Sequence, residues 1–304
     1  MRKQAVIGAA VLALAIGSGG YVAASDGPER SGSAVATQTG SGAGFSGAAG
    51  DRLRATGLTA DQRLVSFRLD RPGSVLPLGK VSGLQGDTRL VGIDYRVQNG
   101  KLYGVGDRGG IYTVREIGAR ATKVSQLGVA LQGSSFGVDF NPAANRLRVV
   151  SDTGQNLRHN IDDPAGAPAA GSTAVDGTLT NPPVPPATTG TTANGVTGVA
   201  YTNNDLSAAT ATTLFDLDTA QDRVSVQSPA NAGSLAPTGG LGVDAPADSG
   251  FDIYSSAGRG TNTGYAVTGS RVLRVDVLTG AARSTGSFPQ GRQVVDLAIP
   301  LKQG

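Results

Sequence analysis

The chain is predicted to be all-β and to fold as a five-bladed β-propeller, and three features of the sequence support this. Helical periodicity is nearly absent, and residues 51–304 consist of short runs rich in Val, Ile, Leu, Tyr and Thr, separated by Gly, Asn and Asp. One motif recurs at intervals near 45 residues, which is typical of a four-stranded propeller blade. The two ends of the domain also complement each other, because one supplies a strand that the other lacks.

The recurring motif is predicted to be the first, inner strand of each blade. Its copies are GIDYR at Gly92, GVDFN at Gly137, GVAYT at Gly198, GVDAP at Gly242 and VVDLA at Val294. They are 45, 61, 44 and 52 residues apart, and the long interval contains DDPAGAPAAGS and NPPVPPATTG. Segments so rich in proline and glycine are typical of inserted loops.

The later strands of the first four units follow in chain order. We expect them at 101–106, 110–114 and 121–128 in the first unit, and at 146–151, 156–161 and 173–179 in the second. In the third unit they are expected at 212–218 and 223–228, and in the fourth at 251–256, 265–269, 272–277 and 282–288.

The ring is predicted to close through its two ends. VVDLAIP at 294–300 resembles a first strand with nothing after it, whereas 53–58, 63–70 and 75–84 resemble later strands without a first one. Joining them in one blade removes a free sheet edge. A pair of β-sandwiches is the alternative, but it leaves the shared spacing unexplained.

The N-terminal part predicts export. Residues 1–24 have the basic start, apolar run and small residues of a secretory signal peptide cut after Ala24, although an uncleaved anchor is the alternative. Residues 25–50 are Gly-, Ser- and Ala-rich and are predicted to form a flexible linker before a single domain at 51–304. We therefore expect a bacterial protein that is secreted or held in the cell envelope, with no stable membrane span after cleavage.

Charge and cysteine content exclude some classes of function. The net charge is only +3, so the chain has no electrostatic footprint for nucleic acid. The chain has no cysteine, which excludes a disulfide framework and a lipoprotein attachment. A single histidine without cysteine offers too few ligands for a conventional zinc site. We expect a monomer.

The stretch VVSDTGQNLRHN raises the question of an active site. Asp152-Thr153-Gly154 matches an aspartic protease motif, but the repeat places Asp152 at the position of Asp107, in a turn between second and third strands. Ser135 lies in a G-x-S-x-G match that is followed by a strand instead of the required helix. His159 is expected to be a surface residue of the third strand. The turn interpretation therefore needs no catalytic role.

The equivalent inner-strand positions hold the more informative carboxylates. These positions are Asp94, Asp139, Asp244 and Asp296, with Ala200 as the exception. Carboxylates around a central channel could bind a hard cation such as Ca²⁺ or Mg²⁺, or supply an acid or base. The favoured interpretation is structural: each Asp accepts hydrogen bonds from the next blade, from its backbone or from arginines. The candidate arginines are Arg96, Arg146, Arg148 and Arg158.

The sequence also resembles a known bacterial family. LVGIDYR, NGKLYGVG, FGVDFNPAANRLRVVSDTGQNLR, GVAYTNN, TTLFDLDT and LGVD are similar to the family called domain of unknown function 4394 (DUF4394), over nearly all of 51–300. The resemblance implies an exported, propeller-like repeat protein and brings no reaction, ligand or catalytic residue.

These observations favour a non-catalytic binding or interaction module outside the cytoplasmic membrane. Its partner is expected to be an extracytoplasmic protein, a glycan or a small ligand. The alternative is a hydrolase of the lactonase or sugar-hydrolase kind, with a divalent cation held by the channel carboxylates, an analogy that rests on the fold alone.

Overall fold

The computed structural model describes residues 52–207, 210–256 and 260–303. The described residues all belong to one compact unit. The predicted signal peptide at 1–24 and linker at 25–50 lie outside the described residues. Among those residues, no helix has the length and apolar character needed to cross a membrane.

Five antiparallel sheets of four strands each make up the domain, and we number these blades I to V. Blade I contains β4 (Leu90–Arg96), β5 (Lys101–Gly106), β6 (Gly110–Arg115) and β7 (Arg120–Gln126). Blade II contains β8 (Phe136–Asn141), β9 (Arg146–Ser151), β10 (Asn156–His159) and β11 (Thr173–Val175). Blade III contains β14 (Val196–Tyr201), β15 (Leu214–Asp218), β16 (Arg223–Gln227) and β17 (Leu235–Gly240).

Blade IV contains β18 (Gly250–Ser256), β19 (Thr261–Thr268), β20 (Arg271–Val275) and β21 (Ala282–Ser287). Blade V combines β22 (Val294–Ala298) with β1 (Arg54–Thr59), β2 (Arg63–Arg68) and β3 (Arg71–Lys80). A short 3₁₀ helix at Ala230–Ala232 and a two-stranded sheet of β12 (Thr180–Asn181) and β13 (Thr191–Thr192) complete the described elements. The five-bladed β-propeller is thereby confirmed.

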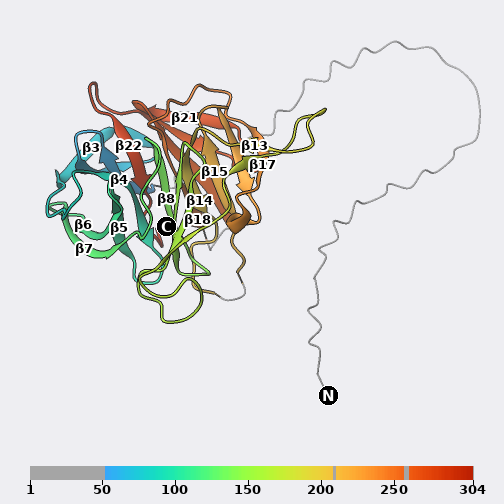
Figure 1. Cartoon of the computed structure of the whole chain (residues 1–304). Coiled ribbons are helices and arrows are strands. Elements are labelled where there is room, and N and C mark those ends of the chain that lie inside the picture. Colours follow the sequence, from blue (N-terminus) through green and yellow to red (C-terminus); the bar gives the residue numbers. More distant parts are fainter. Residues whose placement is uncertain (1–51, 208–209, 257–259, 304) are drawn as a thin grey trace, which may run out of the picture. The chain divides into compact units, whose positions relative to one another are not determined.

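The ring closes through blade V. Strand β22 pairs antiparallel with β1, with Thr56 opposite Ala298 and Leu58 opposite Asp296. The last strand of the chain therefore lies beside the first, as Figure 1 shows where red and blue ribbons meet. This pairing is the predicted closure.

The inner strands β4, β8, β14, β18 and β22 contact one another in succession, and β22 contacts β4. Glycines on the inner strands allow this close approach. A Cβ added to Gly137 would lie 2.7 Å from the backbone N of Val199, and one added to Gly250 would lie 2.5 Å from the Cα of Asp296. Because no real Cβ fits at such distances, any larger residue there forces neighbouring strands apart.

Apolar clusters fill the spaces between adjacent blades. Phe67 of blade V packs in one cluster with Val267 of blade IV, and Leu64 of blade V packs in another with Tyr112 of blade I. Burial is therefore achieved between blades, and each blade depends on its neighbours for a core.

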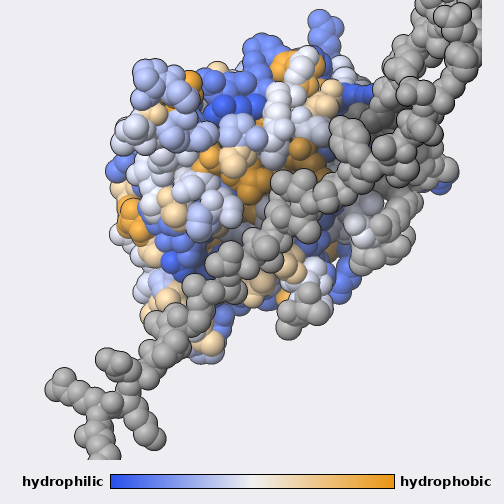
Figure 2. Space-filling view, turned by 90° about the vertical axis from the view of Figure 1, so that its right-hand side faces the viewer, coloured by the Kyte–Doolittle hydropathy of each residue, from blue (hydrophilic) through white to orange (hydrophobic). Residues whose placement is uncertain are grey.

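A few large apolar side chains stay exposed in turns, loops and outermost strands. The face in Figure 2 shows an apolar area bordered by hydrophilic side chains. Over the described residues the exposed ones are Leu76, Ile117, Val124, Val175, Val184, Leu206 and Leu278.

The prediction for the fourth blade is wrong in its register. GVDAP lies in the loop between β17 and β18, where Asp244 is exposed. The true copy is GFDIY at Gly250, and the predicted second strand is in fact the inner strand β18. Pro246 explains why GVDAP does not form an inner strand, because proline has no N–H to donate and does not fit a central strand.

Candidate functional site

The structure brings three of the four predicted carboxylates together. Asp94, Asp139 and Asp296 lie on the inner strands β4, β8 and β22. Asp244 is not part of this group, and Asp252 of β18 occupies its expected position. We call Asp94, Asp139, Asp252 and Asp296 the channel carboxylates; each is at most 7% exposed.

Each channel carboxylate accepts a backbone N–H from the next inner strand or from the residue just beyond it. Asp94 Oδ2 accepts from Phe140 at 2.8 Å, Asp139 Oδ1 from Tyr201 at 3.3 Å, Asp252 Oδ2 from Ile299 at 2.6 Å, and Asp296 Oδ2 from Ile93 at 2.7 Å. Asp252 also accepts the N–H of the adjacent Ile253 with its Oδ1, at 2.6 Å. Blade III has no such carboxylate, because its equivalent residue is Ala200. The carboxylates thus link consecutive blades, as the structural interpretation predicted.

The channel carboxylates lie in an environment that disfavours their charge. Burial raises the pKa of Asp94 well above its ordinary value, and the nearby Asp252 raises it further. Burial also raises the pKa of Asp139, and the nearby Asp94 raises it further. Burial raises the pKa of Asp252 to about 7 and that of Asp296 well above its usual range. The channel therefore favours the protonated form of these carboxylates over the free anion.

Three of these carboxylates are close enough to share one ion. Asp94, Asp139 and Asp252 each offer an oxygen, and these oxygens all lie within 4.8 Å of one another. Ca²⁺ binds oxygens at about 2.3–2.6 Å, so ligands on opposite sides of the ion lie about that far apart. These separations suit a hard cation, and an Asp252 oxygen that bound it would also accept a backbone N–H, because both oxygens of Asp252 already do so.

The four candidate arginines do not bind the channel carboxylates and pair with other aspartates instead. Arg96 forms a bidentate pair with Asp162, and Arg146 pairs with Asp163 at 2.8 Å. Arg148 and Arg158 both bind Asp176, at 2.6 and 3.0 Å. These acids lie in the long connections that follow β10 and β11, so the arginines hold the inserted segments of blade II.

The Asp-Thr-Gly stretch is a turn. Asp152 follows β9, and its Oδ1 accepts the N–H of Ser134 at 2.9 Å, while Gly154 has a φ of +84°. Asp107 accepts the N–H of Thr88 at 2.8 Å in the same position of blade I. Ser135 immediately precedes β8, so a strand follows it as predicted.

His159 is buried, and the expectation of a surface residue is wrong. Its Nε2 lies 2.8 Å from Ser125 Oγ on β7, and its Nδ1 lies 2.9 Å from Thr173 Oγ1 on β11. Burial lowers the pKa of His159 to about 4. The imidazole is therefore neutral near pH 7; it links blade II to blade I through the Ser125 hydroxyl and binds Thr173 within its own blade.

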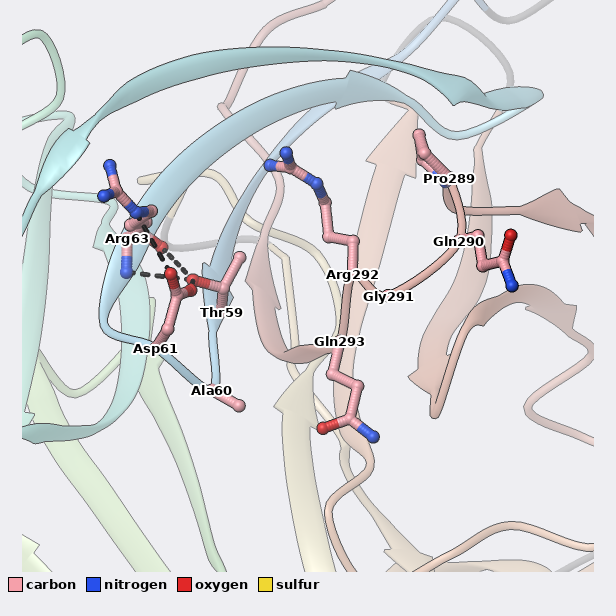
Figure 3. Close-up of a pocket in the computed structure, with 9 residues that line it drawn as sticks. All are labelled: Thr59, Ala60, Asp61, Arg63, Pro289, Gln290, Gly291, Arg292 and Gln293. Atoms are coloured by element: carbon pink, nitrogen blue, oxygen red, sulfur yellow. Dashed lines mark hydrogen bonds and ion pairs between the residues drawn. The ribbon is translucent and has the colours of Figure 1, made fainter.

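A concave site that the sequence did not indicate lies at the rim of blade V. We call it the rim pocket; it has a volume of about 440 Å³, and Figure 3 shows its lining. One wall is the β1–β2 turn, and the other is the loop that enters β22. The lining residues are Thr59, Ala60, Asp61, Arg63, Pro289, Gln290, Gly291, Arg292 and Gln293. No local motif marks this site, because its walls come from opposite ends of the domain.

The chain belongs to the family described as domain of unknown function (DUF4394), whose model matches residues 63–298. The resemblance seen in the sequence is thereby confirmed. No curated protein matches the chain.

Several solved structures are distantly similar. A crystal structure of a nidogen–laminin complex has a TM-score of 0.45 and 13% identity, covering 82% of this chain and 85% of that one. An auxiliary nutrient binding protein from Bacteroides thetaiotaomicron has a TM-score of 0.43 and 9% identity, covering 79% and 59%. A protein of unknown function from the same organism has a TM-score of 0.44 and 13% identity, covering 83% and 68%.

Proposed function

We propose that this protein is an exported, monomeric β-propeller that acts as a non-catalytic binding module outside the cytoplasmic membrane. The use of the channel carboxylates carries the proposal. Each one accepts a backbone N–H from a neighbouring inner strand, so these acids join blades instead of converging on a substrate pocket. In the rim pocket the only acid, Asp61, is paired with Arg63 at 3.0 Å.

Two kinds of surface support binding. The rim pocket has the size of a small-molecule site, for which volumes of about 300–1,000 Å³ are common. The exposed apolar side chains offer contacts for a larger partner. The partner class is an extracytoplasmic protein, a glycan or a small ligand.

An activity assay separates this proposal from a lactonase or sugar hydrolase. The wild type and the double variant Asp94→Asn/Asp139→Asn are given lactones and aryl glycosides in millimolar Ca²⁺. We expect no turnover above that of the double variant. Turnover that the wild type shows and the double variant loses would establish the hydrolase instead.

Export and oligomeric state have their own tests. The basic, apolar and small residues of 1–24 motivate cleavage after Ala24. Protein recovered outside the cytoplasm is expected to begin at Ser25 and to sediment as a monomer. Met1 at the N-terminus of that material would contradict cleavage, and a dimer in sedimentation would contradict the monomer.

We also propose that the channel holds a structural cation, because three of its carboxylates lie close to one another. Asp94, Asp139 and Asp252 are buried, and none of the ion pairs among the described residues involves a channel carboxylate. A cation would replace the missing counter-charge and tie three blades together.

Thermal melts in chelator and in millimolar Ca²⁺ or Mg²⁺ test the cation. Binding to the folded state alone raises the melting temperature as the free ion increases. We expect this response in the wild type and its loss in Asp94→Asn/Asp139→Asn, whose amide oxygens preserve the backbone bonds. If the wild type melts identically in chelator and in metal, the cation proposal is wrong, and only protons and backbone N–H groups balance the negative charge of the channel carboxylates.

A further inference from the structure

The rim pocket has walls that are fixed before any ligand arrives. In the β1–β2 turn, Thr59 Oγ1 accepts the N–H of Arg63 at 2.9 Å and donates to Asp61 at 2.5 Å. The backbone N–H of Ala60 donates to the carbonyl of Gln293 at 3.2 Å and so joins the two walls. A site whose shape is held in this way loses little freedom on binding.

The second wall presents Arg292 from a tight turn. The N–H of Arg292 donates to the carbonyl of Pro289 at 3.1 Å, and Gly291 between them has a φ of +81°. This is the arrangement of a type II turn, in which glycine suits the third position. The turn fixes the backbone of Arg292 beside the pocket.

The guanidinium of Arg292 is the one cationic group of the pocket that no acid neutralises. Asp61 pairs with Arg63 at 3.0 Å, and the hydrogen bond from Thr59 together with Arg63 lowers the pKa of Asp61. Among the described residues, the Arg292 side chain has no ion pair or side-chain hydrogen bond, and none is drawn to it in Figure 3. It is half-buried. The lining contains two arginines and one aspartate, so it carries one excess positive charge.

The lining contains two further polar side chains besides the Thr59 hydroxyl that the β1–β2 turn already uses. The amides of Gln290 and Gln293 can each donate and accept, which suits hydroxyl groups. A single planar guanidinium recognises a carboxylate through two parallel N–H···O bonds. We infer that the rim pocket binds a small polyhydroxylated carboxylic acid, of the sugar-acid class, through Arg292. This inference rests on the proposed binding function and names its ligand class.

Calorimetric titration with a matched pair of sugars tests the assignment. D-Glucuronate and D-glucose differ at one carbon, which carries a carboxylate in the first and a hydroxymethyl group in the second. The wild type is expected to bind D-glucuronate and to bind D-glucose at least ~10-fold more weakly, as the loss of a charge-assisted pair implies. Arg292→Gln should lose the same factor for D-glucuronate and melt like the wild type.

Arg108→Gln provides the control, because Arg108 is an exposed arginine in the β5–β6 turn of blade I and does not line the pocket. Its affinity for D-glucuronate should equal that of the wild type. Absence of D-glucuronate binding, equal affinity for both sugars, or an unchanged affinity in Arg292→Gln would overturn the inference. Turnover in the hydrolase assay would overturn the proposed function separately.

Discussion

The channel and the rim pocket place aspartates in opposite electrostatic settings. In the channel, Asp94 and Asp252 are buried, and burial raises the pKa of both. In the pocket, the side chain of Asp61 is 67% exposed and its pKa is lowered, because Thr59 and Arg63 donate to it. The same residue type is thus disfavoured as a charge in one region and favoured in the other.

The difference follows from what each region has available as a partner. Inner strands bring backbone N–H groups and other carboxylates to the channel, so the acids there compete for protons and stabilise the ring. The rim is built from turns, where water and arginine side chains surround the acid. Mutations should therefore act on stability in the channel and on binding at the rim.

The largest effect is expected from removing the element that both regions share. Strand β22 carries Asp296 to the channel, and the loop before it forms one pocket wall. A chain that ends at Arg292 loses a sheet partner and buried apolar residues, which costs several kcal/mol of a net stability of roughly 5–15 kcal/mol. Circular dichroism melts should show loss of the cooperative transition. A chain ending at Leu301 serves as control, and equal melting of both truncations would disprove ring closure.

Replacing a single channel carboxylate should destabilise the fold less than removing β22 does, but more than replacing the rim residue Asp61. Asp94→Ala leaves the N–H of Phe140 without its acceptor, at a cost of about 1–3 kcal/mol. Asp94→Asn keeps an acceptor oxygen and should cost less. Urea unfolding measures both. If the alanine and asparagine variants lose the same stability, the backbone bond is not what the carboxylate contributes.

Asp252 should give stability a distinct pH dependence. The pKa of Asp252 in the folded protein is about 7, above the ordinary 3.8. Its contribution to the stability of the fold is therefore complete below pH 3.8 and is lost as pH rises through 7. Between pH 6 and 8 this loss is about 1.4 kcal/mol for a single group titrating at pH 7. Urea unfolding in chelator should show a weaker dependence for Asp252→Asn.

The comparison of wild type and Asp252→Asn also removes the effect of the histidine. His159 has a lowered pKa of about 4, so its contribution to stability is complete above the ordinary 6.5 and is lost as pH falls. The effect of His159 on stability therefore runs opposite to that of Asp252 between pH 6 and 8. Because His159 is present in both the wild type and Asp252→Asn, its effect cancels in the comparison. Identical pH dependences would mean that Asp252 does not titrate in this range.

The smallest effect on stability is expected at the rim. Asp61→Ala removes an exposed ion pair with Arg63, and such pairs contribute about 0–1 kcal/mol. Its melting temperature should stay close to that of the wild type, in contrast to Asp94→Ala. A loss at Asp61 equal to the loss at Asp94 would remove the distinction between the two regions.

The sequence predicted the blades well because a blade is built from local contacts. Short apolar strands, turn residues and a repeating interval are all readable along the chain, and they placed Asp94, Asp139 and Asp296 on inner strands. The error at Asp244 arose because two aspartates lie eight residues apart in blade IV. Pro246 was the available signal that Asp252 is the correct one.

By itself, the sequence determined the fold class, the number of blades, the closure through β22 and the turn character of Asp152. Only the tertiary structure decided which carboxylates meet in the channel, that His159 is buried between hydroxyls, and that Arg292 faces Arg63 across a pocket. The physical reason is range; the closure through β22 is the exception, because the repeat showed which strand each end of the domain lacks. Strand alternation and turn chemistry act between neighbours in the chain, whereas the channel, the buried imidazole and the rim pocket depend on residues brought together by packing of separate blades.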